Sequence, residues 1–122
     1  VWFYGACYDE KQIAQLIFNA DLCLSPGNVG LTSIHALSFG TPVITHNNFS
    51  HQMPEFEAII KGVNGDFFKE NDIEDMVTTT KNWFQNHPDK NAELIAHCYK
   101  IIDSKYNPYY QISIIKQALK KC

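Results

Sequence analysis

The chain has 122 residues, of which 45% are hydrophobic, enough for one buried core and too few for a second domain of ordinary size. Its formal net charge is −3, with ten basic and thirteen acidic residues spread along the sequence. This distribution excludes the strongly basic surface by which proteins bind nucleic acids. No apolar run approaches the length of a membrane span and no secretory signal opens the chain, so we expect a cytoplasmic protein.

Short apolar runs alternate with helical patterns in the first part of the chain. Four runs are typical of strands, at residues 1–5, 21–25, 42–46 and 66–68. Helices are expected at 9–20, opened by a capping box of Asp9 and Gln12, at 31–39, closed by Gly40, and from Pro54 onward. Strands that alternate with helices through short links predict a parallel sheet with right-handed crossovers.

From residue 71 the pattern is wholly helical. Asn71 and Glu74 are expected to cap the first of these helices, and the last runs from Tyr109 to Lys121, after a break at 106–108, with its basic residues at the end. We therefore expect one domain over residues 1–122, with an α/β sheet part at 1–70 and C-terminal helices at 71–122. The predicted fold class is α/β, a Rossmann-like parallel sheet with helices on both faces and a helical C-terminal tail.

The loop after the second predicted strand is the first candidate for a binding site, because ligands of parallel sheets bind beyond the carboxyl ends of the strands. Glycines at positions 27 and 30 permit close approach to the backbone, and a helix N-terminus follows, which favours a phosphate. The expected donors are the backbone N–H groups of Gly30, Leu31 and Thr32 and the hydroxyls of Thr32 and Ser33. A Pro-Gly turn before any helix has the same appearance, so the loop alone also fits a plain turn.

Over residues 1–85 the chain resembles the family-4 (group 1) glycosyltransferases. The segments that carry the resemblance are ADLCLSP at 20–26, Gly30-Leu31, ALSFGTPVI at 36–44, Pro54-Glu55 and GVNG at 62–65. The resemblance implies part of the C-terminal Rossmann-like domain of a GT-B fold. It also implies a retaining transferase that moves a sugar from a nucleoside-diphosphate sugar to a glycan or lipid-linked acceptor, without a metal or another cofactor.

The family pattern has two glutamates eight residues apart, which fall here on Gly27 and His35, and neither position is acidic. The resemblance assigns donor and phosphate binding to Gly27, Asn28, Gly30, Leu31 and Thr32, although Asn28 also fits a turn residue. It makes His35 a candidate for ribose or sugar contact, the alternative being a histidine wedged under a neighbouring helix. Glu55 and Glu57 are both candidates for the acidic residue near the donor, and no residue is assigned to catalysis.

The resemblance also implies partners. The family's N-terminal acceptor domain and the first β-α units are absent from this sequence, so we expect an excised part that is inactive alone and that would meet a membrane only through a full-length protein. In a full Rossmann-like sheet further strands would separate the strands expected at 1–5 and 21–25, so we expect the chain either to close that gap or to self-associate. An unpaired strand edge is a template for another chain, which motivates a homodimer. Tyr106, Tyr109 and Tyr110 are then expected to form a severed domain interface.

Two other function classes fit the predicted architecture. One is another sugar-nucleotide enzyme of GT-B type, such as an epimerase, or a glycan phosphorylase, which would need a pyridoxal-binding lysine that no motif indicates. The other is a non-catalytic α/β interaction module of response-regulator type, which would show an acidic pair at its first strand end, where this chain has Gly5-Ala6-Cys7.

Histidines and cysteines give little sign of a metal site. His46 and His51 lie five residues apart in a polar segment with only Glu55 or Glu57 as nearby further ligands, so we interpret them as loop residues without function. The four cysteines are far apart, which predicts free thiols rather than a zinc site or a disulfide framework.

Overall fold

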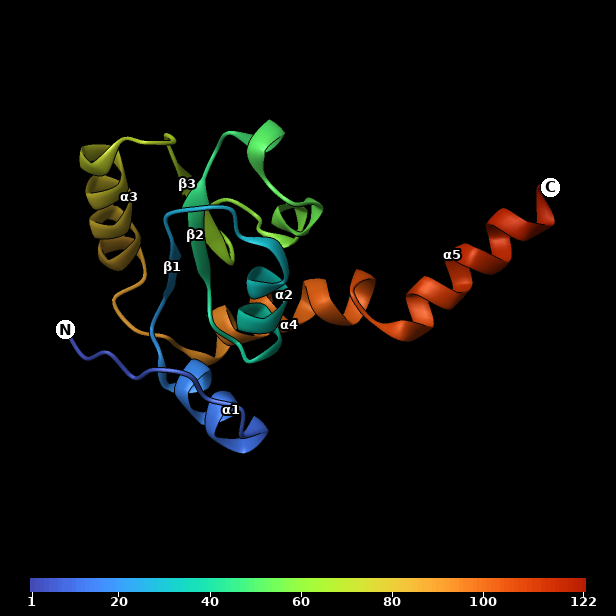
Figure 1. Cartoon of the computed structure of the whole chain (residues 1–122), viewed down its shortest axis with the longest axis horizontal. Helices are drawn as coiled ribbons and strands as arrows, with labels where there is room; N and C mark the ends of the chain where they lie inside the picture. Colours follow the sequence, from blue (N-terminus) through green and yellow to red (C-terminus); the bar gives the residue numbers. More distant parts are fainter.

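A three-stranded parallel sheet, flanked by helices, forms the centre of the computed structural model, which describes all residues 1–122 (Figure 1). The helices are α1 (Glu10–Asn19), α2 (Gly30–Ser38), α3 (Ile73–Asn86), α4 (Ala92–Lys105) and α5 (Pro108–Lys120). The strands are β1 (Cys23–Ser25), β2 (Val43–His46) and β3 (Gly65–Phe68), and two short 3-10 helices, η1 (Phe49–His51) and η2 (Pro54–Ala58), connect β2 to β3.

The strands lie in the order β1-β2-β3, with β2 in the middle. Ile44 of β2 pairs with Leu24 on one side and with Asp66 on the other. All four residues of β2 are buried, as expected for a central parallel strand that is covered on both faces.

Each face of the sheet has its own hydrophobic core, because neighbouring residues of β2 point to opposite faces. Val43 belongs to the larger core, which α2, η2 and α4 complete, and Ile44 belongs to the smaller core with Trp83 of α3. Figure 1 shows the same layers, with α3 on one side of the sheet and α2 and α4 on the other. The expected α/β class with a parallel sheet and helices on both faces is therefore confirmed.

The strand expected at residues 1–5 is wrong. This segment pairs with no strand, and the side chains of Trp2 and Phe3 are 77% and 90% exposed. Aromatic and β-branched residues favour a strand only when a neighbouring strand and a buried face are available, and here neither is. The homodimer expected from an unpaired strand edge stays a prediction, because β1 still forms one edge of the sheet.

Two further local expectations differ in detail. The helix expected from Pro54 is only the 3-10 helix η2, and the cap expected from Asn71 and Glu74 is made one residue later, where the Asp75 N–H donates to Asp72 Oδ1 (3.0 Å). Asn71 has a φ of 60°, a left-handed conformation that ends the preceding turn and that asparagine tolerates better than most residues. The cap at Asp9 is confirmed, since the Gln12 N–H donates to Asp9 Oδ1 at 2.8 Å.

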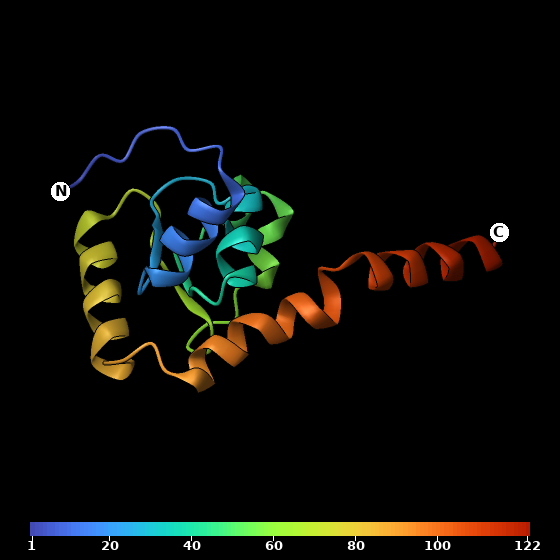
Figure 2. The same cartoon turned by 90° about the horizontal axis from the view of Figure 1, so that it is seen from below.

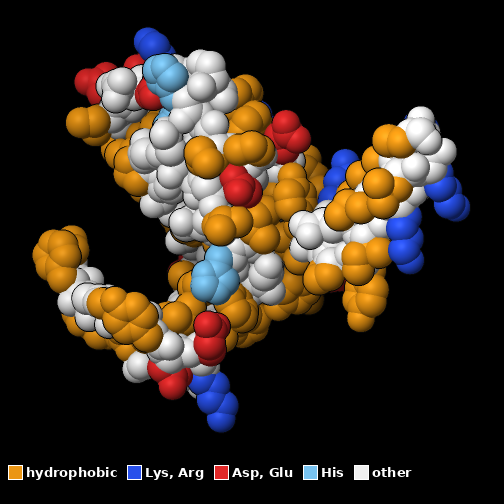
Figure 3. Space-filling model, turned by 45° about the vertical axis from the view of Figure 1, so that its right-hand side comes forward, with side chains coloured by type: hydrophobic (Ala, Val, Ile, Leu, Met, Phe, Trp, Pro, Cys, Tyr) orange, Lys and Arg blue, Asp and Glu red, His pale blue; other side chains and the backbone are white.

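The C-terminal helix α5 projects away from the rest of the molecule (Figures 1 and 2). None of its residues is buried. Figure 3 shows apolar side chains along this helix and basic ones near its end; Tyr109, Ile115 and Leu119 are among its exposed residues. The helical C-terminal tail is thus confirmed. None of the helices combines the length and the apolar character that a membrane crossing requires.

Candidate functional site

The segments that follow the three strands meet at one edge of the sheet. They are the loop at residues 26–29 after β1, the turn with η1 after β2, and residues 69–70 after β3. The Asn47 N–H donates to Phe68 O (2.8 Å), which holds the turn after β2 against the end of β3. Side chains from three separate parts of the sequence are therefore brought together at this edge.

The loop at residues 26–29 is held in place by side chains that belong to β2 or follow it. Thr45 Oγ1 donates to Gly27 O (3.1 Å), and the Val29 N–H donates to Gln52 Oε1 (2.8 Å). Gln52 Nε2 in turn donates to Thr45 Oγ1 and to His46 O, both at 3.0 Å. Gln52 thus connects the loop to β2 through three hydrogen bonds, so that the loop backbone has a defined conformation.

The first turn of α2 presents backbone donors next to this loop. The helix begins at Gly30, whose φ is 42°, and no side chain caps it. The Thr32 N–H donates to Val29 O (3.2 Å), which occupies one of the three amides expected to bind phosphate. The N–H groups of Gly30 and Leu31 remain at the positive end of the helix, where an anion is favoured.

The hydroxyl of Ser33 is unsuited to ligand binding. Its side chain is fully buried, and Oγ lies 2.9 Å from Gly30 O and 3.0 Å from Glu55 O, both of which are acceptors. Ser33 therefore joins α2 to η2, and the expectation that it binds a phosphate is wrong. Of the two expected hydroxyl donors only that of Thr32 lies on an exposed residue.

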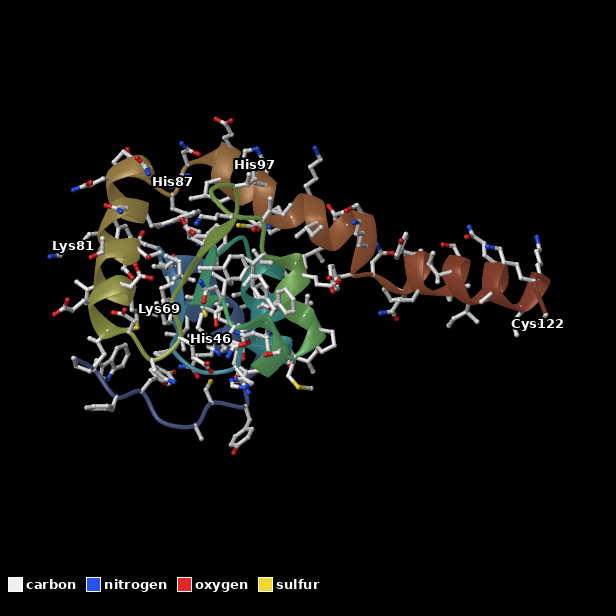
Figure 4. The ribbon with its side chains drawn as sticks, turned by 90° about the horizontal axis from the view of Figure 1, so that it is seen from above. His46, Lys69, Lys81, His87, His97 and Cys122 are labelled. Atoms are coloured by element: carbon white, nitrogen blue, oxygen red, sulfur yellow. The ribbon has the colours of Figure 1, made fainter.

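His46 ends β2 inside the molecule, with 1% of its surface exposed (Figure 4). The Asn48 backbone N–H donates to His46 Nδ1 (3.2 Å), so Nδ1 is an acceptor and the ring proton is on Nε2. His46 Nε2 therefore donates to Asn28 Oδ1 at 3.2 Å. The interpretation of His46 as a loop residue is wrong, since it links the ends of β1 and β2.

The carboxylate of Glu70 is the acceptor for the neighbouring hydrogen-bond donors at this edge. Asn48 Nδ2 donates to Glu70 Oε2 (2.6 Å), and His51 Nδ1 lies 3.0 Å from Glu70 Oε1. The hydrogen bond from Asn48, and after it that from His51, holds the pKa of Glu70 below its usual value, so the carboxylate is ionised at neutral pH. His46 Nε2 is 3.9 Å from Glu70 Oε1, which places the carboxylate beside the Asn28 loop.

Thr32 and His35 face away from this edge, toward α1. Both line a mainly apolar pocket of ≈330 Å³ between α1 and α2, with Leu16 and Ile17 on the opposite wall. His35 is exposed, and its ring lies 5.2 Å from that of Phe39 in a tilted arrangement. The structure thus separates the ribose candidate His35 from the cluster around Glu70, and it does not place His35 under a neighbouring helix.

The acidic candidates Glu55 and Glu57 lie on η2, which packs against α2 and leads toward the end of α4. Glu55 Oε2 is buried without a hydrogen-bond partner. The pKa of Tyr106, just after α4, is raised by burial and secondarily by the charges of Glu57 and Glu55. Their carboxylates therefore lie near Tyr106, away from the His35 pocket.

Three residues of the edge were missed by sequence reasoning: His46, Gln52 and Glu70. Each acts through partners distant in the sequence or on neighbouring strands, and no local motif marks them. The only available signal was position, because His46 and Glu70 come at the ends of predicted strands, where a parallel sheet binds ligands.

No group of three or more His, Cys, Asp and Glu side chains is arranged to hold a metal ion. Comparison of the chain with protein-family models, with curated proteins and with solved structures finds no match.

Proposed function

We propose that the chain is the donor-binding part of a retaining glycosyltransferase that uses a nucleoside-diphosphate sugar, with a glycan or a lipid-linked molecule as acceptor. The proposal includes a Rossmann-like, GT-B type domain and an acceptor-binding domain outside this chain. It also includes a cytoplasmic location, which the four free cysteines support because thiols persist in reducing compartments.

The observation that carries the proposal is the fixed loop at residues 26–29 together with the uncapped start of α2. The loop backbone is held by Thr45 and Gln52, so the N–H groups of Gly30 and Leu31 are oriented before a ligand arrives. Oriented amides at a positive helix end stabilise the negative charge of a diphosphate, and in a transfer reaction they stabilise the charge that develops on this leaving group.

The chemistry of the surroundings supports a ligand with both charged and neutral polar parts. The helix end suits phosphate, whereas the pocket with Thr32 and His35 is mainly apolar with three polar residues, as nucleoside-binding sites commonly are. The sequence resemblance in the segments at 20–31 and 36–44 selects a nucleotide sugar among such ligands.

The test is a titration of the isotope-labelled chain with UDP, with GDP and with inorganic phosphate, followed by NMR of the backbone amides. We expect one nucleoside diphosphate to shift the Gly30 and Leu31 amides with a dissociation constant of about 1 mM or lower, and phosphate alone to act far more weakly. The absence of a selective shift of these two amides with either nucleotide would contradict the proposal.

A valine at position 27 gives a matched steric test. A Cβ at Gly27 meets no atom within 4 Å and the residue has no positive φ, so Gly27→Val leaves the fold intact while filling the space in front of the loop. We expect it to abolish the nucleotide shifts. Thr78→Val, on an exposed residue of α3, introduces the same side chain away from the loop and serves as the control.

A further inference from the structure

The edge of the sheet carries a second set of polar groups that the phosphate contacts leave unused. Glu70 offers a carboxylate, and Asn28 offers a carboxamide on an exposed loop. His46 Nε2 lies 3.2 Å from Asn28 Oδ1 and 3.9 Å from Glu70 Oε1, so both groups are within reach of one buried atom.

Asn28 has a free donor at this position. The backbone N–H of Asn48 donates to Nδ1 of His46, which places the ring proton on Nε2. That proton requires an acceptor, so the oxygen of Asn28 faces the ring and its NH2 group points away from it, with no partner in the chain. The backbone amide of Asn48, after β2, thereby fixes the orientation of a side chain that follows the neighbouring strand β1.

Glu70 has free acceptor capacity. A carboxylate offers about four lone-pair sites, and Asn48 and His51 use only part of them. The side chain is 24% exposed, so a solute can reach it. The hydrogen bonds from Asn48 and His51 also keep the group ionised, and an ionised acceptor forms stronger hydrogen bonds than a neutral one.

The charge of this cluster decides between two kinds of ligand. A carboxylate repels phosphate, which the start of α2 attracts, so the two ligand groups are sorted to separate positions along the edge. A neutral hydroxyl both donates and accepts, which matches a carboxylate acceptor beside an amide donor.

We infer that Glu70 and Asn28 form a subsite for the hydroxyl groups of the donor sugar, with His46 as a positioning residue for Asn28. This inference rests on the proposed function and specifies where the neutral part of the nucleotide sugar binds.

The experiment compares Glu70→Gln with the unaltered chain at pH 7, using UDP, GDP, UDP-glucose and GDP-mannose. We expect the nucleotide sugar of the preferred base to bind more tightly than its diphosphate. Glu70→Gln should weaken nucleotide-sugar binding about tenfold, the size of one charge-assisted hydrogen bond, and should leave diphosphate binding unchanged. Glu93→Gln, on an exposed residue in the first turn of α4, makes the same charge change and should alter neither affinity.

A second variant keeps the test decisive if Glu70→Gln disturbs the turn after β3. Asn28→Ala removes the carboxamide of an exposed loop residue, and with it the acceptor of the His46 Nε2 proton, and should also lower the ratio of nucleotide-sugar to diphosphate affinity about tenfold. Unaltered ratios in the variants, with diphosphate binding intact, would overturn the subsite while the proposed function stands. Failure of the unaltered chain to bind any of the four nucleotides would overturn both.

Discussion

Gly65 is the residue at which the sheet tolerates least change. It pairs with Val43 at the start of β3, and a Cβ placed on it would lie 2.0 Å from Val43 O and 2.7 Å from Ile59 Cγ2. A backbone oxygen cannot move aside as a flexible side chain can. We therefore expect Gly65→Ala to lower the free energy of unfolding by about 2–4 kcal/mol, measured by urea denaturation.

Gly27→Ala is the control for that substitution, because a Cβ there contacts nothing and φ is not positive. Its free energy of unfolding should stay within about 0.5 kcal/mol of the unaltered chain. Equal losses at both positions would mean that glycine is needed for backbone flexibility in general, and that the close approach of β2 and β3 is not the cause.

For single residues, the sequence gives the type of side chain but not the residues that it contacts. The loop glycines were found because a Pro-Gly turn is a local signal, and Gly27 and Gly30 do lie at the edge of the sheet. His46 was misread because a histidine in a polar stretch looks the same whether it is exposed or buried. Its function depends on Asn28 and Asn48, and the contact with Asn28 follows only from the pairing of β1 with β2.

Elements defined by local chemistry were predicted well. The helix cap at Asp9 and the end of α2 near Gly40 both depend on neighbours within a few residues. The segment at 1–5 failed because a strand depends on a partner, which apolar composition does not supply. A local pattern is therefore reliable for helix ends and insufficient for a strand at an edge of the sheet.

Helix α1 depends on a residue far away in sequence. Lys90, in the connection between α3 and α4, donates through Nζ to Phe18 O, to Ala20 O (2.9 Å) and to Thr41 Oγ1 (2.9 Å). Two of these acceptors are carbonyls at the end of α1, which have no partner within the helix. Nζ also lies 4.9 Å from the centre of the Phe18 ring, a favourable cation–π distance.

Replacement of this lysine should loosen α1. Burial lowers the pKa of Lys90, which means that desolvation of the ammonium group offsets part of the hydrogen-bond energy. We expect Lys90→Met to cost about 1–2 kcal/mol in urea denaturation and to speed amide hydrogen exchange in α1. Lys81→Met, at an exposed site that points outward from α3 (Figure 4), should change neither quantity. Unaltered exchange in Lys90→Met would contradict the capping role.

The whole molecule shows why the site was only half predictable. The α/β order of elements placed a binding edge at the ends of the strands, and the loop after β1 lies there as predicted. Glu70 and Gln52 belong to the same edge because β3 pairs with β2 and because η1 turns Gln52 back toward Val29. Such convergence is a property of the assembled sheet, and no single segment of the sequence carries it.

The projecting helix α5 should be dispensable for folding. None of its residues is buried, and both cores are complete by Tyr106. The helix also has its own cap, because the Tyr110 N–H donates to Asn107 Oδ1 (3.0 Å). We therefore expect removal of residues 108–122 to change the free energy of unfolding by less than about 1 kcal/mol, measured by urea denaturation followed by circular dichroism.

The nucleotide shifts of Gly30 and Leu31 should also persist, since α5 lies away from the sheet edge (Figure 1). A larger loss would mean that in solution the exposed apolar side chains of α5 fold back onto the body or onto a second copy, and light scattering of both chains would distinguish these two arrangements.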